Sequence, residues 1–195
     1  MATPPTPVAG AVLCGGASRR MGTDKSLIRV DGVPLAERVA RTLEAAGCHP
    51  VVLVGGDEHA LSSATGRRVV ADRWPGEGPV GGVLTALTAL ADAPAVLVAA
   101  CDLPALTADA VAAVVDAHLL VARSDAPIAV TIADSGRPEP ALACWSTSAA
   151  TALNERFPAE RGLLAIALAL GAEAVSVEAA ALHNANRPGD LRSPM

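Results

Sequence analysis

Short apolar runs alternate along the first part of the chain with segments that have helical spacing of apolar residues or helix-capping residues. The apolar runs predict buried strands at 8–13, 50–54, 68–71 and 95–100. The intervening segments predict helices at 34–46, 57–64, 80–91 and 107–120. Strands and helices that alternate in this order predict a mostly parallel sheet with helices on both faces.

The rest of the chain is less regular. Apolar runs at 128–132 and 141–145 flank a turn sequence at 134–138, which predicts a hairpin or strand pair at the edge of the sheet. Two helices, a strand and a polar turn that leads into a short helix are predicted at 146–155, 161–170, 174–177 and 184–191. We therefore expect an α/β protein with three αβα layers and a mostly parallel Rossmann-like sheet with an antiparallel edge.

The composition agrees with one compact unit. At 195 residues, the chain is long enough to bury a substantial core without disulfides or metals. Hydrophobic residues make up 51% of it and aromatic residues only 2%, so Ala, Val and Leu must fill that core. The prolines near the start predict a disordered tail at 1–7, followed by a single domain at 8–195.

Charge and cysteine usage narrow the class of protein. The formal net charge of −5 and the pI near 5.3 argue against a wide basic surface that grips nucleic acid. No apolar run long enough to span a bilayer is free of helix breakers, and the first residues lack the features of a signal peptide. The four cysteines have no Cys-x-x-Cys spacing and are expected to be small buried thiols. We expect a cytoplasmic protein that binds neither membrane nor nucleic acid.

The segment at 11–25, AVLCGGASRRMGTDK, carries the clearest candidate chemistry. Two adjacent glycines let the backbone approach a ligand closely, and cations follow at 19, 20 and 25. Backbone N–H groups and cations in this arrangement bind phosphates, whereas the alternative is a surface turn with solvated charges. The spacing excludes two common phosphate loops: Thr23 follows Gly22 where a Walker loop needs lysine, and Gly15-Gly16-Ala17 breaks the dinucleotide fingerprint.

Asp102 is the second candidate. It follows the apolar run at 95–100 and precedes Leu103-Pro104, which holds its carboxylate at the tip of a predicted strand. A carboxylate there suits Mg²⁺, which takes one or two carboxylates together with phosphate oxygens and waters; an ordinary turn or capping aspartate is the alternative. Because ligands in such folds bind beyond the carboxyl ends of the strands, we expect the loop after Leu13 and Asp102 to meet at one crevice.

The loop pattern Leu-x-Gly-Gly-x-x-x-Arg-Met-Gly-x-Asp-Lys resembles the signature of the sugar-nucleotide-type nucleotidyltransferases. Its Asp24-Lys25 ending is most similar to the molybdenum cofactor guanylyltransferases, the MobA family. Further segments that resemble this family lie at 75–82, 101–104, 184–191 and, most weakly, 137–140. The resemblance runs from about Val8 to Leu191 and implies a fold of the nucleotide-diphospho-sugar transferase type.

The same resemblance implies roles for individual residues. Lys25 would contact the phosphates, Arg19 would contact the departing pyrophosphate, and Asp102 would bind Mg²⁺, which makes these three the expected catalytic residues. Asp72 would lie near the base or the ribose of the nucleotide. The residues implied to bind the substrates or the metal are Leu13, Cys14, Gly15, Gly16, Lys25, Asp72, Gly78, Asp102, Asn184 and Asn186.

The implied reaction is the Mg²⁺-dependent transfer of GMP from GTP to the terminal phosphate of molybdopterin, with release of pyrophosphate. Transient contact with molybdoenzymes or other cofactor-synthesis proteins is expected for such an enzyme. Cys14 stands where alanine is usual, and Val54-Gly55-Gly56 lacks the asparagine that many family members place near the base. A nucleotidyltransferase that uses CTP or another phosphorylated acceptor is therefore one alternative, and a non-catalytic nucleotide-binding partner of molybdoenzyme maturation is another.

Overall fold

The computed structural model describes residues 8–15, 24–122 and 130–185. The tail expected at 1–7 and the end of the segment predicted at 184–191 lie outside these ranges. The described residues form a seven-stranded sheet with the order β5-β4-β1-β6-β8-β7-β9. Its strands are β1 (Val8–Leu13), β4 (Val51–Val54), β5 (Val69–Val70), β6 (Ala95–Ala100), β7 (Val130–Asp134), β8 (Pro138–Ser146) and β9 (Glu173–Ser176).

Helices connect most of these strands. The α-helices are α1 (Leu35–Ala45), α2 (Glu58–Thr65), α3 (Pro79–Ala89), α4 (Ala108–Val121), α5 (Ala149–Arg156) and α6 (Leu163–Ala169). The strand and helix predictions in the first part of the chain are confirmed to within about two residues, and Thr107 caps α4 by accepting a hydrogen bond from Ala110 N.

The sheet is parallel through β5, β4, β1 and β6, as the alternation of strands and helices predicts. β8 then pairs antiparallel with both β6 and β7, and β9 lies outside β7 and parallel to it. The predicted fold class is therefore confirmed. The hairpin of β7 and β8 was expected at the edge, but β9, the last described strand, occupies that place and pairs parallel to β7 from Thr131 to Asp134.

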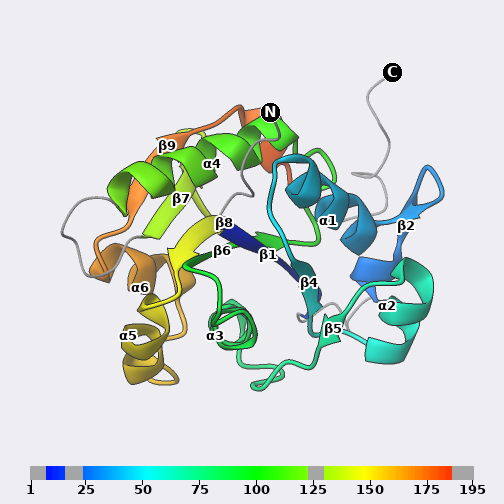
Figure 1. The fold of residues 1–195 in the computed structure, drawn as a ribbon, viewed down its shortest axis with the longest axis horizontal. Helices are drawn as coiled ribbons and strands as arrows, with labels where there is room; N and C mark the ends of the chain where they lie inside the picture. The colour runs from blue at the N-terminus through cyan, green and yellow to red at the C-terminus, as the bar shows by residue number, and fades with distance from the viewer. Residues whose placement is uncertain (1–7, 16–23, 123–129, 186–195) are drawn as a thin grey trace.

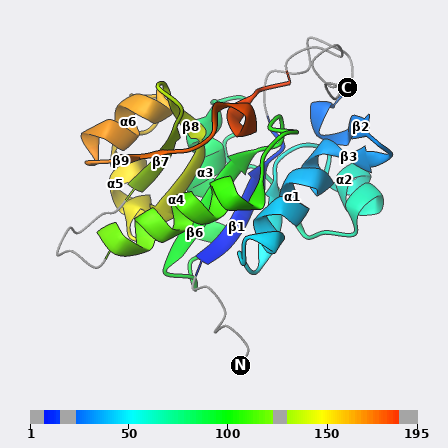
Figure 2. The ribbon, with the colours of Figure 1, turned by 90° about the horizontal axis from the view of Figure 1, so that it is seen from above.

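Both faces of the sheet are covered by helices, which gives three layers. Figure 1 shows α1 and α4 on one side of the sheet and α3 and α5 on the other. Figure 2 shows α1 and α4 side by side in front of the central strands. The buried side chains accordingly form two clusters, one under α1, α2 and α4 and one under α3, α5 and α6.

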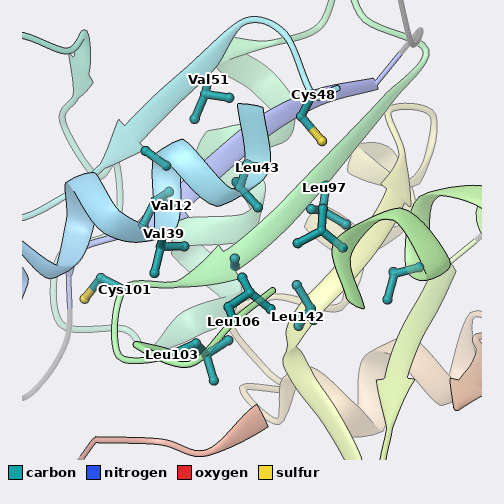
Figure 3. Packing of buried hydrophobic residues seen from close by; sticks show 14 of the residues in the cluster. Val12, Val39, Leu43, Cys48, Val51, Leu97, Cys101, Leu103, Leu106 and Leu142 are labelled. Carbon is teal, nitrogen blue, oxygen red and sulfur yellow. The ribbon is translucent and has the colours of Figure 1, made fainter. Parts of the chain in front are cut away.

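The central strand β1 divides its side chains between these two clusters. Val8 and Val12 face α1, whereas Ala9, Ala11 and Leu13 face α3. Figure 3 shows Val39 and Leu43 of α1 packed near Val12. Burial on both faces explains why the strand reads as a continuous apolar run rather than an alternating one.

Several elements were not predicted. The pair β2 (Arg29–Val30) and β3 (Val33–Pro34) forms a small antiparallel hairpin, whose turn places Asp31 and Gly32 at φ angles of 52° and 80°. An Asp-Gly pair at a two-residue turn is a known hairpin signal. The 3₁₀ helices η2 (Lys25–Leu27) and η3 (Ala179–Leu182) were also missed. In addition, β8 continues to Ser146 because its pairing with β6 extends to Ala95.

Candidate active site

Lys25 and Asp102 meet at the carboxyl edge of the parallel strands. Lys25 begins η2, and Asp102 follows β6 by two residues. The Lys25 Nζ lies 3.0 Å from Asp102 Oδ2, with side chains that are 12% and 25% exposed. The structure thus joins the two segments that were expected to meet, from positions far apart in the sequence. Both side chains of the pair are therefore partly buried.

The backbone around Lys25 is fixed by its neighbours. Asp24 caps η2, because its Oδ1 accepts hydrogen bonds from Ser26 N at 3.0 Å and from Ser26 Oγ at 2.5 Å. Ser26 is fully buried. The hydrogen bonds between Asp24 and Ser26 therefore fix the backbone on either side of Lys25.

Backbone hydrogen bonds to neighbouring segments hold the start of the first loop where it follows β1. Cys14 N donates to Val54 O at 2.8 Å, and Cys101 N donates to Leu13 O at 3.1 Å. Gly15 follows as an exposed residue. Leu13, Cys14 and Gly15 thus lie at this edge of the sheet. Gly16 and Arg19, two further predicted site residues, lie outside the described residues.

Gly55, which follows β4, packs closely against Gly15 of this loop. A Cβ added to Gly55 would lie 3.1 Å from Gly15 N, and Gly55 has a φ of +77°. Both facts favour glycine at this position. The side chain of Val54 is buried on the α3 side of the sheet, so it offers no polar group to a ligand.

Asp72 is the second carboxylate that approaches this loop. Its Oδ1 accepts hydrogen bonds from Trp74 N at 2.9 Å and from Thr85 Oγ1 at 3.3 Å. Its Oδ2 is 3.7 Å from the position of a Cβ added to Gly15. The structure therefore brings Asp72 next to the first loop.

Gly78 lies at the start of α3, where it is the N-cap with a φ of +89°. Pro79 follows at the first helical position, which suits a helix start. Two further glycines of this helix pack closely. A Cβ added to Gly81 would be 2.9 Å from Trp74 Cβ, and one added to Gly82 would be 3.2 Å from Leu13 Cδ2. Because these two glycines have no side chains, the start of α3 lies close to Leu13 and to Trp74, in the segment after Asp72.

The end of the described chain returns to Asp102. Ala185 N donates a hydrogen bond to Asp102 O at 2.9 Å. The neighbouring Asn184 donates from Nδ2 to Glu139 Oε2 at 3.3 Å. Asn184 therefore lies beside the loop that carries Asp102, whereas Asn186 lies outside the described residues. Glu139 is not among the predicted site residues, although the weak motif at 137–140 contains it.

Cys14 and Cys101 are two buried cysteines at the site. All four cysteines are free and buried, as predicted. The pKa of the Cys14 thiol is raised well above its usual value by a hydrogen bond with the Cys101 thiol and by burial. A thiol whose pKa is raised in this way is a poor nucleophile, so neither the geometry nor the charge of the site favours covalent catalysis by Cys14.

The donor set at the site fits a divalent cation bound together with phosphates. Asp102 supplies a partly exposed carboxylate oxygen, which is a hard ligand of the kind Mg²⁺ prefers. The described residues contain no group of three or more His, Cys, Asp or Glu side chains that could hold a metal without other ligands. Mg²⁺ at Asp102 would therefore complete its shell with phosphate oxygens and waters.

Comparisons with known proteins agree with this geometry. The family described as the MobA-like NTP transferase domain matches residues 10–174. The chain belongs to this family. It is a nucleotidyltransferase, with the fold that its resemblance implied.

Relatives of this nucleotidyltransferase include a probable molybdenum cofactor guanylyltransferase from Chloroflexus aggregans, which is 34% identical over 95% of this chain and 92% of its own length. A probable molybdenum cofactor guanylyltransferase from Opitutus terrae is 47% identical, but the match spans 52% of this chain and 50% of that relative. Among solved structures, molybdopterin-guanine dinucleotide biosynthesis protein A from Archaeoglobus fulgidus superposes with a TM-score of 0.73 at 26% identity, covering 94% of each chain.

No helix in the described part of this nucleotidyltransferase combines the length and apolar character needed to cross a membrane.

Proposed function

We propose that this nucleotidyltransferase transfers GMP from GTP to the terminal phosphate of molybdopterin and releases pyrophosphate. The observation that carries the proposal is the 3.0 Å contact between Lys25 Nζ and Asp102 Oδ2, which unites the two family motifs at one site. The names of the relatives from Chloroflexus aggregans and Opitutus terrae supply the substrate class.

In this proposal the acceptor phosphate attacks the α-phosphorus of GTP in line, and the bond to the pyrophosphate leaving group breaks. Asp102 would hold Mg²⁺, which when bound neutralises charge on the phosphates. Lys25 places an ammonium group beside the same position, where it would stabilise charge that moves to the leaving group. Arg19 and Gly16 would bind the phosphates from the first loop. Positioning and charge neutralisation supply most of the acceleration in such a reaction.

Asp72 would bind the nucleoside of GTP. Its Oδ1 is held by Trp74 N and Thr85 Oγ1, while its Oδ2 is directed toward Gly15. Gly55 and Gly56 follow β4, and the Val54 side chain is buried, so backbone groups rather than an asparagine side chain would contact the base here. CTP is therefore the second nucleotide to test.

The test is a pyrophosphate-release assay with purified protein, molybdopterin and either GTP or CTP. We expect Mg²⁺-dependent release with GTP that stops when EDTA is added and that requires molybdopterin. Faster turnover with CTP than with GTP would show that CTP, rather than GTP, is the nucleotide substrate. Binding of GTP without any release of pyrophosphate would support the non-catalytic alternative and reject the proposed reaction.

A further inference from the structure

The segment that contains Asn184 is bonded to two separate parts of the protein, once through the backbone of Ala185 and once through the Asn184 side chain. Its own segment is bonded to the Asp102 loop through Ala185 N and Asp102 O, at 2.9 Å. Its amide nitrogen is bonded to Glu139 Oε2 at 3.3 Å, across 45 positions in the sequence. Glu139 lies in β8 opposite Ala133, where the register between β7 and β8 shifts. The side-chain amide is thus bonded to the sheet, and the backbone of the next residue is bonded to the Asp102 loop.

The chemistry of Glu139 fixes which way this amide faces. The second carboxylate oxygen, Oε1, accepts a hydrogen bond from Ala141 N at 3.0 Å. An ionised carboxylate can only accept hydrogen bonds, so the NH₂ edge of Asn184 must face Glu139. In a planar amide the carbonyl oxygen lies on the other edge. That oxygen is therefore directed away from Glu139, on a segment that is tied to Asp102.

We propose that Glu139 is a positioning residue that fixes the polarity of the Asn184 amide, so that its carbonyl oxygen faces the bound substrates. This inference rests on the proposed function, because it assigns Asn184 to the acceptor side of that site. A carbonyl oxygen donates an electron pair, so it suits an N–H group of the acceptor or a divalent cation, but repels a bare phosphate oxygen. The experiment below distinguishes an N–H group of the acceptor from a divalent cation as the partner of this oxygen.

Glutamine at position 139 should reverse the polarity. In Glu139→Gln the side-chain carbonyl oxygen stays with Ala141 N, which places the glutamine NH₂ group opposite Asn184. Two NH₂ groups cannot bond to each other, so the Asn184 amide turns and presents its own NH₂ group to the substrates. Glu139→Ala leaves the amide unanchored, and it still adopts the parent orientation part of the time. We therefore expect the nearly isosteric Glu139→Gln to be more harmful than the truncation.

A double substitution should restore the parent arrangement. In Glu139→Gln with Asn184→Asp, the glutamine NH₂ group donates to one carboxylate oxygen of residue 184. The other oxygen of that carboxylate then faces the substrates as an electron-pair donor. The pair also keeps the same total charge as the parent pair of Glu139 and Asn184. Recovery by this exchange is not expected for a residue that only supports the fold.

The activity arm measures kcat, the KM for molybdopterin and the Mg²⁺ concentration that gives half-maximal rate. We expect a rise of about tenfold in one of the last two for Glu139→Gln, a smaller rise for Glu139→Ala, and values within about threefold of the parent for the double variant. A change in KM assigns the carbonyl oxygen to the acceptor, and a change in the Mg²⁺ requirement assigns it to the cation. The matched control is Glu178→Gln, because Glu178 precedes η3 and makes no side-chain capping hydrogen bond.

The second arm needs no substrate and therefore tests the positioning even if the proposed function fails. In NMR spectra of the parent, the Asn184 NH₂ protons should show nuclear Overhauser contacts to the Glu139 side chain. Those contacts should be lost in Glu139→Gln at an unchanged melting temperature. Overhauser contacts retained in Glu139→Gln, or a harmful Glu139→Ala beside a harmless Glu139→Gln, would overturn the proposal. A parent protein without transferase activity would instead reject the proposed function.

Discussion

Two aspartates at the same edge of the sheet are held in different ways. Asp102, after β6, is paired with the cationic Lys25 at 3.0 Å. Asp72, after β5, has no such cationic contact among the interactions described and is held by the neutral donors Trp74 N and Thr85 Oγ1. Both carboxylates follow apolar strands in the sequence.

Because the two carboxylates have different partners, we expect them to have different roles in the reaction. A carboxylate beside an ammonium group belongs to a charged centre, where substituting either partner alters the field on a phosphate. A carboxylate that accepts from a backbone N–H and a hydroxyl is held in a fixed direction, which suits recognition of a neutral part of a ligand. Asp102 should therefore control the rate of the reaction, and Asp72 should control the affinity for the nucleotide.

The largest expected effect is that of Asp102→Asn. This variant keeps the size of the side chain but removes the charge that would bind Mg²⁺, so kcat should fall by about 10²–10³-fold. Pyrophosphate release under saturating GTP and molybdopterin measures the loss. Turnover at the parent rate would contradict the assignment of Asp102 to the charged centre.

Lys25→Met tests the other half of this centre and keeps the aliphatic stem of the lysine, which is mostly buried. The fall in kcat should be about 10²-fold. Because the two side chains are in contact, the double variant with Asp102→Asn should lose less than the product of the two single losses. Full additivity in this cycle would show that the two groups act independently.

Asp72→Ala should have a smaller effect and a different signature. Loss of a carboxylate hydrogen bond to the nucleoside should raise the KM for the nucleotide by about tenfold and leave kcat within about threefold of the parent. Thr85→Val removes one donor to Asp72 and keeps the buried volume, so it should produce a weaker form of the same change. Thr85→Ser keeps the hydroxyl and is the control. An effect on kcat alone would remove the distinction between Asp72 and Asp102.

A buried histidine should make the folded protein less stable at low pH, which limits the pH range in which variants of the two aspartates can be assayed. His118 of α4 is 1% exposed, and burial lowers its pKa from 6.5. Below pH 6.5 the imidazole of His118 takes up a proton in the unfolded chain but stays neutral in the folded protein. The free energy of unfolding therefore falls as the pH drops from 6.5 toward the lower pKa of His118 in the folded state. The slope should reach at most about 1.4 kcal/mol per pH unit.

Urea unfolding at pH 7.5 and 5.5 measures this loss, and His118→Gln should reduce it. Equal losses in the parent and the variant would show that other groups cause the acid sensitivity.

Cys14→Ala is expected to have the smallest effect on activity, with kcat within about twofold of the parent. Cys14 lies beside both the first loop and Cys101, yet its raised pKa keeps it a neutral thiol. A thiol-specific reagent should label the folded protein slowly and the urea-unfolded protein at once, since the cysteines are buried. Rapid labelling of the folded protein with loss of activity would contradict this account of Cys14.

Much of the fold was predictable because its signals are local. Strand β6 was expected at 95–100 and is found at Ala95–Ala100, and the Thr107 cap fixes the start of α4. The spacing of glycines and cations in the first loop likewise led to the correct family. Each of these features depends on residues within a few positions of one another, so no knowledge of distant contacts was needed.

The hairpin of β2 and β3 could have been predicted from Asp31-Gly32, and was overlooked. The place of β9 could not, because strand order depends on which distant segments pair. Similarly, no local signal indicates that Arg67 bonds to both Glu37 and Glu44 on α1.

The sequence by itself determined the alternation of strands and helices, the family to which the first loop belongs and the presence of carboxylates at two strand ends. Only the tertiary structure decided that Asp102 pairs with Lys25, that Asp72 accepts hydrogen bonds from Trp74 N and Thr85 Oγ1, and that Asn184 donates to Glu139. The physical reason is distance along the chain. Lys25 and Asp102 are 77 positions apart, and they meet because β1 and β6 are neighbours in a parallel sheet and end at the same edge.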